Sequence, residues 1–176
     1  MSARKQHYGF RRLSYDDLVL VNQWQQRPHV AEWWDVATEY TGDDIADLRL
    51  AMWLVELAGT PFAFIQDYAV HGFGAHPFAY LPPGARGIDQ FIAEPDMLGL
   101  GHGLGFIKAH VTRLFLDGVP VVGTDPHPAN ARAIKAYRKA GFRIVSHEVQ
   151  TAWGPSLLME RRPRKPFGTL PSPGGR

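Results

Sequence analysis

The sequence predicts an α/β (α+β) fold in which helices flank a mixed, mostly antiparallel central sheet. Some short segments alternate apolar and polar residues, as strands do, while others repeat apolar residues every three or four positions, as helices do. A glycine-rich turn joins one such strand to a long helix. The 176 residues, 45% of them hydrophobic, suffice for one core. We expect a single domain over residues 1–162 and a flexible tail over residues 163–176, which is rich in Pro, Gly and basic residues.

The first half of the chain predicts a strand, two helices and a hairpin. The strand spans residues 8–13, and Ser14 caps a helix that ends at Pro28. A second helix starts at Thr41 and runs to about Leu50. The hairpin strands span residues 52–57 and 62–68, and residues 58–61 form the turn between them. A long surface loop follows over residues 70–85. Loops of that length in compact domains are usually functional.

The second half alternates strands and helices. The expected elements are a central strand at 87–92, a helix over 104–116, a strand over 119–125, a helix over 129–140, and strands near 142–150 and 155–161. In the first of these helices, Leu104, Ile107, Val111 and Leu114 mark one buried face.

The glycine-rich turn, MLGLGHGLG at residues 97–105, is the first functional signal. Such a turn at a helix N-terminus presents unpaired N–H groups and the positive end of the helix dipole, which suits a pyrophosphate. It lacks the Lys-Ser or Lys-Thr of a P-loop, and it lies past mid-chain, unlike the turn of a dinucleotide fold. The binding register is either Leu98–Gly103, which we favour because it leaves the helix uninterrupted, or Leu100–Gly105.

A second motif follows the glycine-rich turn. The strand ending at Thr124-Asp125 leads into an alanine-rich helix, with Asn130 near its start and Tyr137 before a Gly-Phe stop. In this order and spacing, the two motifs resemble the GNAT acetyltransferase superfamily. In that family the glycine turn binds the pyrophosphate of acetyl-CoA, and the Asn and Tyr contact the pantetheine arm and the thioester sulfur. The resemblance implies acetyl-CoA as co-substrate, bound by Phe91, Ile92, Leu98, Gly99, Leu100, Gly101, His102, Gly103, Asn130, Ala133 and Tyr137.

Four segments narrow the resemblance to the aminoglycoside 6′-N-acetyltransferases, within a likeness that runs from about residue 10 to residue 159. They are residues 29–34, 86–90, 124–126 and 137–142. The resemblance implies direct transfer of an acetyl group to a small polycationic amine in a ternary complex. Acyltransferases of siderophore biosynthesis, which act on a hydroxylysine-type side chain, share much of the layout and stay an alternative, as does a CoA-binding module without chemistry.

Two residues are predicted to carry the chemistry, because the amine must lose a proton and the thiolate must leave. Tyr137 is predicted to protonate or hydrogen-bond the thiolate, as the family's tyrosine at this position does. Asp89 lies in an otherwise apolar strand, where a carboxylate is costly unless it is paired or faces a cleft. We predict that it binds the substrate ammonium and acts as base; the alternative is an ion pair with Arg86.

The acceptor is predicted to bind to Trp33, Trp34, Asp67 and Asp125, in addition to Asp89. Adjacent tryptophans cannot share a helix face, so one is expected to anchor the core and the other to contact sugar rings or ammonium groups. Asp125 either contacts the acceptor or caps a turn. Asp67 is either a second base and cation ligand or an exposed strand residue.

The loop before Arg86 departs from some related aminoglycoside enzymes, which carry an acidic residue there. Its titratable groups are His71 and His76, and a histidine base is reasonable near neutral pH. The general base therefore stays open among Asp89, Asp67 and these two histidines. No histidines show metal-ligand spacing on one element, and we predict no metal.

Composition excludes several other classes. The chain has a net charge of +2, much of its basic excess lies in the tail, and we expect no nucleic-acid partner. The absence of cysteine excludes disulfides, a thiol nucleophile and a Cys-based zinc site. The first residues lack the apolar stretch of a signal peptide, and no apolar run approaches the roughly 20 residues of a membrane span. We expect a cytoplasmic monomer or homodimer.

Overall fold

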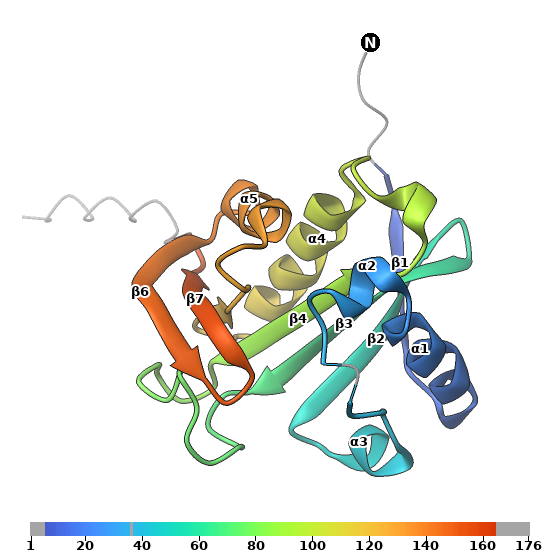
Figure 1. The fold of residues 1–176 in the computed structure, drawn as a ribbon. Helices are drawn as coiled ribbons and strands as arrows, with labels where there is room; N and C mark the ends of the chain where they lie inside the picture. Colours follow the sequence, from blue (N-terminus) through green and yellow to red (C-terminus); the bar gives the residue numbers. More distant parts are fainter. Residues whose placement is uncertain (1–5, 36, 165–176) are drawn as a thin grey trace, which may run out of the picture.

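A seven-stranded sheet forms the centre of the structure, a computed structural model that describes residues 6–35 and 37–164 (Figure 1). The strands are β1 (Tyr8–Arg12), β2 (Leu50–Leu57), β3 (Thr60–Ala69), β4 (Arg86–Ile92), β5 (Val122–Thr124), β6 (Arg143–Thr151) and β7 (Gly154–Arg161). They lie in the order β1-β2-β3-β4-β5-β7-β6. Of these strands, β4 and β5 pair in parallel and all other neighbours are antiparallel, which confirms the predicted mixed, mostly antiparallel sheet.

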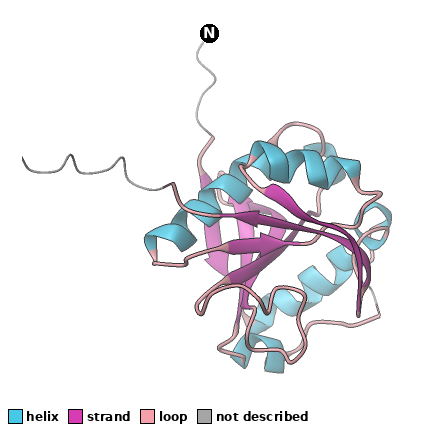
Figure 2. Ribbon diagram, turned by 90° about the vertical axis from the view of Figure 1, so that its left-hand side faces the viewer, coloured by secondary structure: helices cyan, strands magenta, loops and turns pink. Residues whose placement is uncertain are grey.

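The described residues also form five α-helices and two 3₁₀ turns. They are η1 (Tyr15–Asp17), α1 (Leu18–Gln25), α2 (Pro28–Ala31), α3 (Gly42–Ala46), η2 (Pro95–Met97), α4 (His102–Leu116) and α5 (Ala131–Lys139). Figures 1 and 2 show helices on both sides of the sheet. The division of the domain from the tail stays a prediction, and residues 165–176 of that tail lie outside the described residues.

Alternation along the strands divides the core into two layers. On one face, α4 and α5 pack against inward residues of β2, β3 and β4, including Val55, Ile65 and Ile88. On the other face, α1 and α2 pack against the alternate residues Phe64 and Phe91. The sheet thus carries a buried apolar layer on each side, and any polar side chain on an inner strand must find partners within one of them.

The predicted boundaries were wrong in all four helices, and the helix expected over 129–140 is α5, which spans Ala131–Lys139. The first helix ends at Gln25, and Pro28 instead begins α2, where its missing N–H leaves no hydrogen bond unmade. The second ends at Ala46, because Asp47 adopts an extended conformation and its carboxylate accepts the backbone N–H of Arg49. The long helix α4 begins at residue 102, two residues earlier than predicted.

Candidate active site

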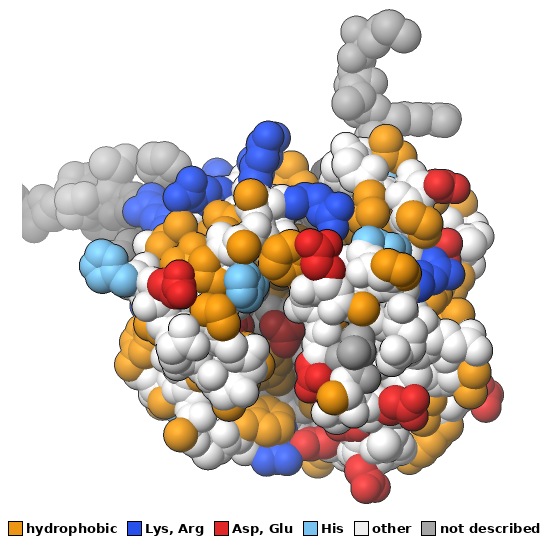
Figure 3. All heavy atoms as spheres, viewed as in Figure 1, with side chains coloured by type: hydrophobic (Ala, Val, Ile, Leu, Met, Phe, Trp, Pro, Cys, Tyr) orange, Lys and Arg blue, Asp and Glu red, His pale blue; other side chains and the backbone are white. Residues whose placement is uncertain are grey.

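A cleft opens where the parallel strands β4 and β5 separate. Their backbone pairing covers Arg86 with Val122 and Gly87 with Gly123, and β4 then continues without this partner. The cleft has a volume of about 1290 Å³ and is lined by parts of β3, β4, α5, the glycine turn and the β6–β7 hairpin. Figure 3 shows the hollow, with acidic side chains inside it and around its rim.

The glycine turn lies at one end of this cleft. Gly99 and Gly101 have φ of 76° and 86°, in the left-handed region that favours glycine, and nothing lies within 4 Å of a Cβ built on either. Gly101 is the N-cap of α4, so the first N–H groups of a 15-residue helix follow directly. Leu98, Gly99, Gly101 and Gly103 line the cleft. An open glycine cradle at a helix N-terminus fits a pyrophosphate.

Two predicted residues of the turn place their side chains elsewhere. His102 is 3% exposed, and its Nδ1 lies 3.2 Å from the hydroxyl of Tyr8, so its ring belongs to the core beside Phe62. It begins α4 rather than extending the loop, and only its backbone N–H is free to face a phosphate. Leu100 is 65% exposed and does not line the cleft.

The helix α5 forms one wall beside the glycine turn. The Asn130 side chain accepts the backbone N–H of Ala133 at 3.0 Å and so caps the helix, while both residues line the cleft. Arg132, Lys135 and Lys139 also line it, from the exposed face of α5. The sequence analysis missed these cations, although their spacing of three and four residues places them on one helix face. They make this end of the cleft positive.

Tyr137 reaches the cleft from α5 although its ring is buried at the helix–sheet interface. It packs against Phe142 and is 3% exposed. Burial raises the pKa of this phenol well above its usual value. Tyr137 therefore holds its proton at neutral pH and suits a proton donor better than a base.

Two carboxylates, Asp89 on β4 and Asp125 just after β5, lie on the cleft where the strands separate. Gln66 Nε2 donates to Asp89 Oδ2 at 2.9 Å, and Trp153 Nε1 donates to Asp125 Oδ2 at 2.6 Å. Burial raises the pKa of Asp89 to about 6. Burial, and then the charge of Asp89, raise the pKa of Asp125 to about 7. The alternative of an ion pair between Asp89 and Arg86 is not formed.

Arg86 instead pairs with Asp67, which does not lie on the cleft. Asp67 accepts from Arg86 Nε at 2.5 Å, Trp53 Nε1 at 3.0 Å and His110 Nε2 at 3.0 Å, on the α4 side of the sheet. Adjacent strand residues face opposite sides, so Gln66 faces the cleft and Asp67 faces α4. Its charge is satisfied by structural partners, and we no longer assign it to the acceptor or the base.

Both tryptophans line the cleft, and Trp34 also packs against the core. Trp34 packs edge-on against Phe64 and Phe91, with ring centroids 6.1 and 4.9 Å apart. Trp33 contacts the ring of His127, in the loop after β5, at 5.5 Å. Further acidic and aromatic lining residues are Glu32, Asp35, Glu39, Tyr40, Asp44, Tyr68 and Trp153.

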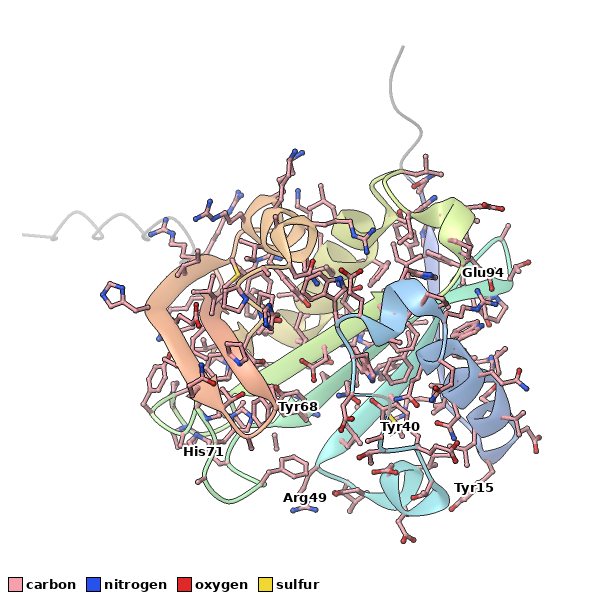
Figure 4. All side chains as sticks on the ribbon, in the orientation of Figure 1. Tyr15, Tyr40, Arg49, Tyr68, His71 and Glu94 are labelled. Atoms are coloured by element: carbon pink, nitrogen blue, oxygen red, sulfur yellow. The ribbon has the colours of Figure 1, made fainter. Side chains whose placement is uncertain are left out.

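The loop histidines differ in position. His76 lines the cleft, with its ring 5.6 Å from that of Trp153, and burial lowers its pKa. His71 does not line the cleft; its Nε2 lies 2.8 Å from the carbonyl of Leu81, and Figure 4 shows it in the outer loop. At the other end of β4, Phe91 and Ile92 line the cleft as predicted for the cofactor.

The described residues contain no cluster of three or more His, Cys, Asp or Glu side chains suited to a metal ion. Within the same residues, no helix is both long and apolar enough to cross a membrane.

Residues 14–150 match the family model described as an acetyltransferase (GNAT) domain. The chain belongs to this family, and it is an acetyltransferase.

Among its relatives are proteins that act on aminoglycosides. The aminoglycoside N(6′)-acetyltransferase type 1 of Klebsiella pneumoniae is 35% identical over 161 residues, covering 85% of this chain and 80% of the relative. A kanamycin resistance protein of Rhizobium radiobacter is 46% identical over 78 residues, covering 44% and 71%. The crystal structure of aminoglycoside acetyltransferase AAC(6′)-Ib with coenzyme A aligns at a TM-score of 0.80 and 34% identity, covering 89% of this chain and 95% of the other. A complex of that enzyme with coenzyme A and kanamycin aligns at 0.78 and 33%, with the same coverage.

Proposed function

We propose that this chain is an acetyl-CoA-dependent aminoglycoside 6′-N-acetyltransferase that transfers the acetyl group directly within a ternary complex. The observation that carries the proposal is the pair Asp89 and Asp125. Both face the cleft, and their hydrogen-bond donors are the neutral side chains of Gln66 and Trp153. A buried carboxylate pair without a cation of its own is a strong site for ammonium groups.

The cleft is polarised along its length in a way that suits both substrates. The glycine turn and the α5 cations Arg132, Lys135 and Lys139 would hold the phosphates of acetyl-CoA. The opposite end carries carboxylates and aromatic rings, which suit the ammonium groups and sugar rings of an aminoglycoside. Relatives named for aminoglycoside acetylation and kanamycin resistance support this acceptor class.

The residues divide the chemistry between them. Acetyl-CoA supplies the acetyl group as a thioester. Asp89 accepts a proton from the acceptor ammonium, which frees the nitrogen lone pair, while Asp125 holds the cationic acceptor beside it. The nitrogen–carbon bond forms as the carbon–sulfur bond breaks, and Tyr137 gives its proton to the departing thiolate. The acylated nitrogen then loses its second proton, which restores the phenol of Tyr137, and Asp89 releases the first proton to solvent. Because both substrates bind together, no covalent enzyme intermediate is required.

Thiol release from acetyl-CoA tests the proposal. Kanamycin, tobramycin, hydroxylysine derivatives and polyamines would be compared as acceptors, with Asp89→Asn as the variant that lacks the base. We expect turnover with kanamycin and tobramycin that is lost in Asp89→Asn. Turnover confined to hydroxylysine derivatives would assign the siderophore-type reaction instead, and acetyl-CoA binding without turnover of any acceptor would indicate a binding module. We place the enzyme in the cytoplasm, as a monomer or homodimer.

A further inference from the structure

A chain of half-buried side chains that line the acceptor end of the cleft leads to Asp89. The hydroxyl of Tyr40 donates to Gln66 Oε1 at 2.7 Å, and Gln66 Nε2 donates to Asp89 Oδ2 at 2.9 Å. Figure 4 shows Tyr40 in front of the sheet, on the segment that leads into α3.

The direction of this chain is fixed at its Asp89 end. An ionised carboxylate can only accept, so Gln66 turns its NH₂ group to Asp89 and its oxygen to Tyr40. The hydroxyl of Tyr40 must then donate to that oxygen. Each link thus forces the next, and the chain ends by donating to a carboxylate oxygen.

The backbone holds Tyr40 in place for this contact. Asn22 on α1 accepts the N–H of Tyr40 at 2.9 Å and donates to its carbonyl, also at 2.9 Å. The ring of Tyr40 packs 5.3 Å from that of Phe64 on β3. The loop is therefore clamped to α1 and to the sheet, which leaves the tyrosine little freedom to turn away from Gln66.

We propose that Tyr40 and Gln66 form a polarised relay that positions Asp89 and keeps it the ionised, proton-accepting member of the Asp89–Asp125 pair. These are positioning residues for the base, and the inference rests on the proposed function. Hydrogen bonds to the ionised form of a carboxyl group favour that form. Tyr40 and Gln66 are half-buried on the wall of the cleft, whereas the donor to Asp125, Trp153, is a 53% exposed residue of the β6–β7 turn.

The other titratable groups near Asp89 act through charge. Tyr68 on β3 and Tyr137 on α5 keep their protons because burial raises the pKa of both phenols, and Asp125 repels a second negative charge. Asp44, on α3, acts on the far end of the relay by raising the pKa of Tyr40, beside the larger effect of burial. Removing the hydrogen bond from Gln66 therefore removes a contact that specifically favours ionised Asp89.

Carboxyl ¹³C NMR of the aspartate-labelled full chain tests the relay without requiring turnover. The Asp89 signal is assigned by its loss in Asp89→Asn and is titrated in the wild type, Tyr40→Phe and Gln66→Leu. We expect the pKa of Asp89 to rise by about one unit in Tyr40→Phe and further in Gln66→Leu, because a donor to the ionised form is weakened and then lost. Tyr15→Phe is the matched control, since Tyr15 is 63% exposed on η1 and its ring lies against Gly42, near Tyr40, while its hydroxyl takes no part in the relay.

A second readout links the relay to catalysis. The acid limb of kcat/KM for kanamycin should move upward in Tyr40→Phe by the same amount as the Asp89 pKa. An unchanged Asp89 pKa in Tyr40→Phe, or an equal shift in Tyr15→Phe, would overturn the proposal, and this holds even if Gln66→Leu does not fold. Failure of the wild type to acetylate any aminoglycoside would overturn the proposed function alone, because the Asp89 titration tests the relay independently.

Discussion

Asp67 and Asp89 lie on neighbouring strands, but neutralising them is predicted to have different effects. Neutral Asp67 should lower the stability of the fold, whereas neutral Asp89 should lower the activity. Asp67 is 3% exposed and accepts hydrogen bonds from Arg86, His110 and Trp53. Asp67→Asn leaves the guanidinium of Arg86, whose side chain is 20% exposed, without its counter-charge. Removing one partner of a buried pair costs about 3–5 kcal/mol. Asparagine keeps one acceptor oxygen, so we expect the lower end, about 3 kcal/mol.

That loss corresponds to a fall in Tm of roughly 6–12 °C for a domain of this size. The assay pairs thermal unfolding of Asp67→Asn and Asp89→Asn with steady-state kinetics on kanamycin. Asp67→Asn should lower Tm and leave the acceptor KM near that of the wild type. Asp89→Asn should keep or raise Tm, because it relieves repulsion with Asp125, and should lower kcat/KM by 100-fold or more, on the order of general-base catalysis. A normal Tm with a large loss of acceptor affinity in Asp67→Asn would refute this assignment.

Three further predictions follow from the cleft. Gly101→Ala should raise the KM for acetyl-CoA several-fold and change the acceptor KM little. The control is Gly59→Ala in the β2–β3 turn, where a similar φ of 80° should cause the same backbone strain of about 1–2 kcal/mol without changing the KM for acetyl-CoA. Equal KM values for acetyl-CoA in the two variants would count against the phosphate site. Tyr137→Phe should lower kcat about 100-fold, measured by thiol release, and a normal kcat would remove it as the proton donor. Activity should fall as pH drops through about 6 to 7, because the raised pKa values of Asp89 and Asp125 mean that both carboxylates become protonated in this range. Asp125→Asn should move the acid limb of the pH–activity profile to lower pH, because it removes the charge that repels ionised Asp89. A shift of the acid limb to higher pH would contradict the interaction between the two carboxylates.

The sequence predicted those features that local patterns determine. The glycine turn, the cap Asn130 and the position of Tyr137 each depend on residues close together in the chain, and the structure places all three on one cleft. The face of β3 was also readable in principle, since alternation of two fixes Asp67 opposite to Gln66. Asp67 lies near the end of β3, but its place in the alternation puts its side chain on the α4 face, away from the cleft.

Other features depend on contacts between distant segments. The strands β4 and β5 separate after two paired residues, which is a property of the whole sheet. This separation brings Asp89 and Asp125 together on the cleft. Trp153 reaches Asp125 from a hairpin turn 28 residues further on. The hydrogen bond between Tyr40 and Gln66 joins a loop residue to a strand residue 26 positions further along the chain. The spacing of residues within one helix or strand cannot predict such contacts between distant segments.

Product analysis by mass spectrometry and NMR, after reaction of the wild type with acetyl-CoA and kanamycin, tests the central claim most directly. We predict a singly acetylated product in which the acetyl group is on the 6′-nitrogen, since the acidic end of the cleft orients the polycation with one amine at Asp89. Acetylation of a different amine of kanamycin would contradict it. Recovery of unmodified kanamycin under conditions in which the enzyme acetylates another amine substrate would contradict it as well.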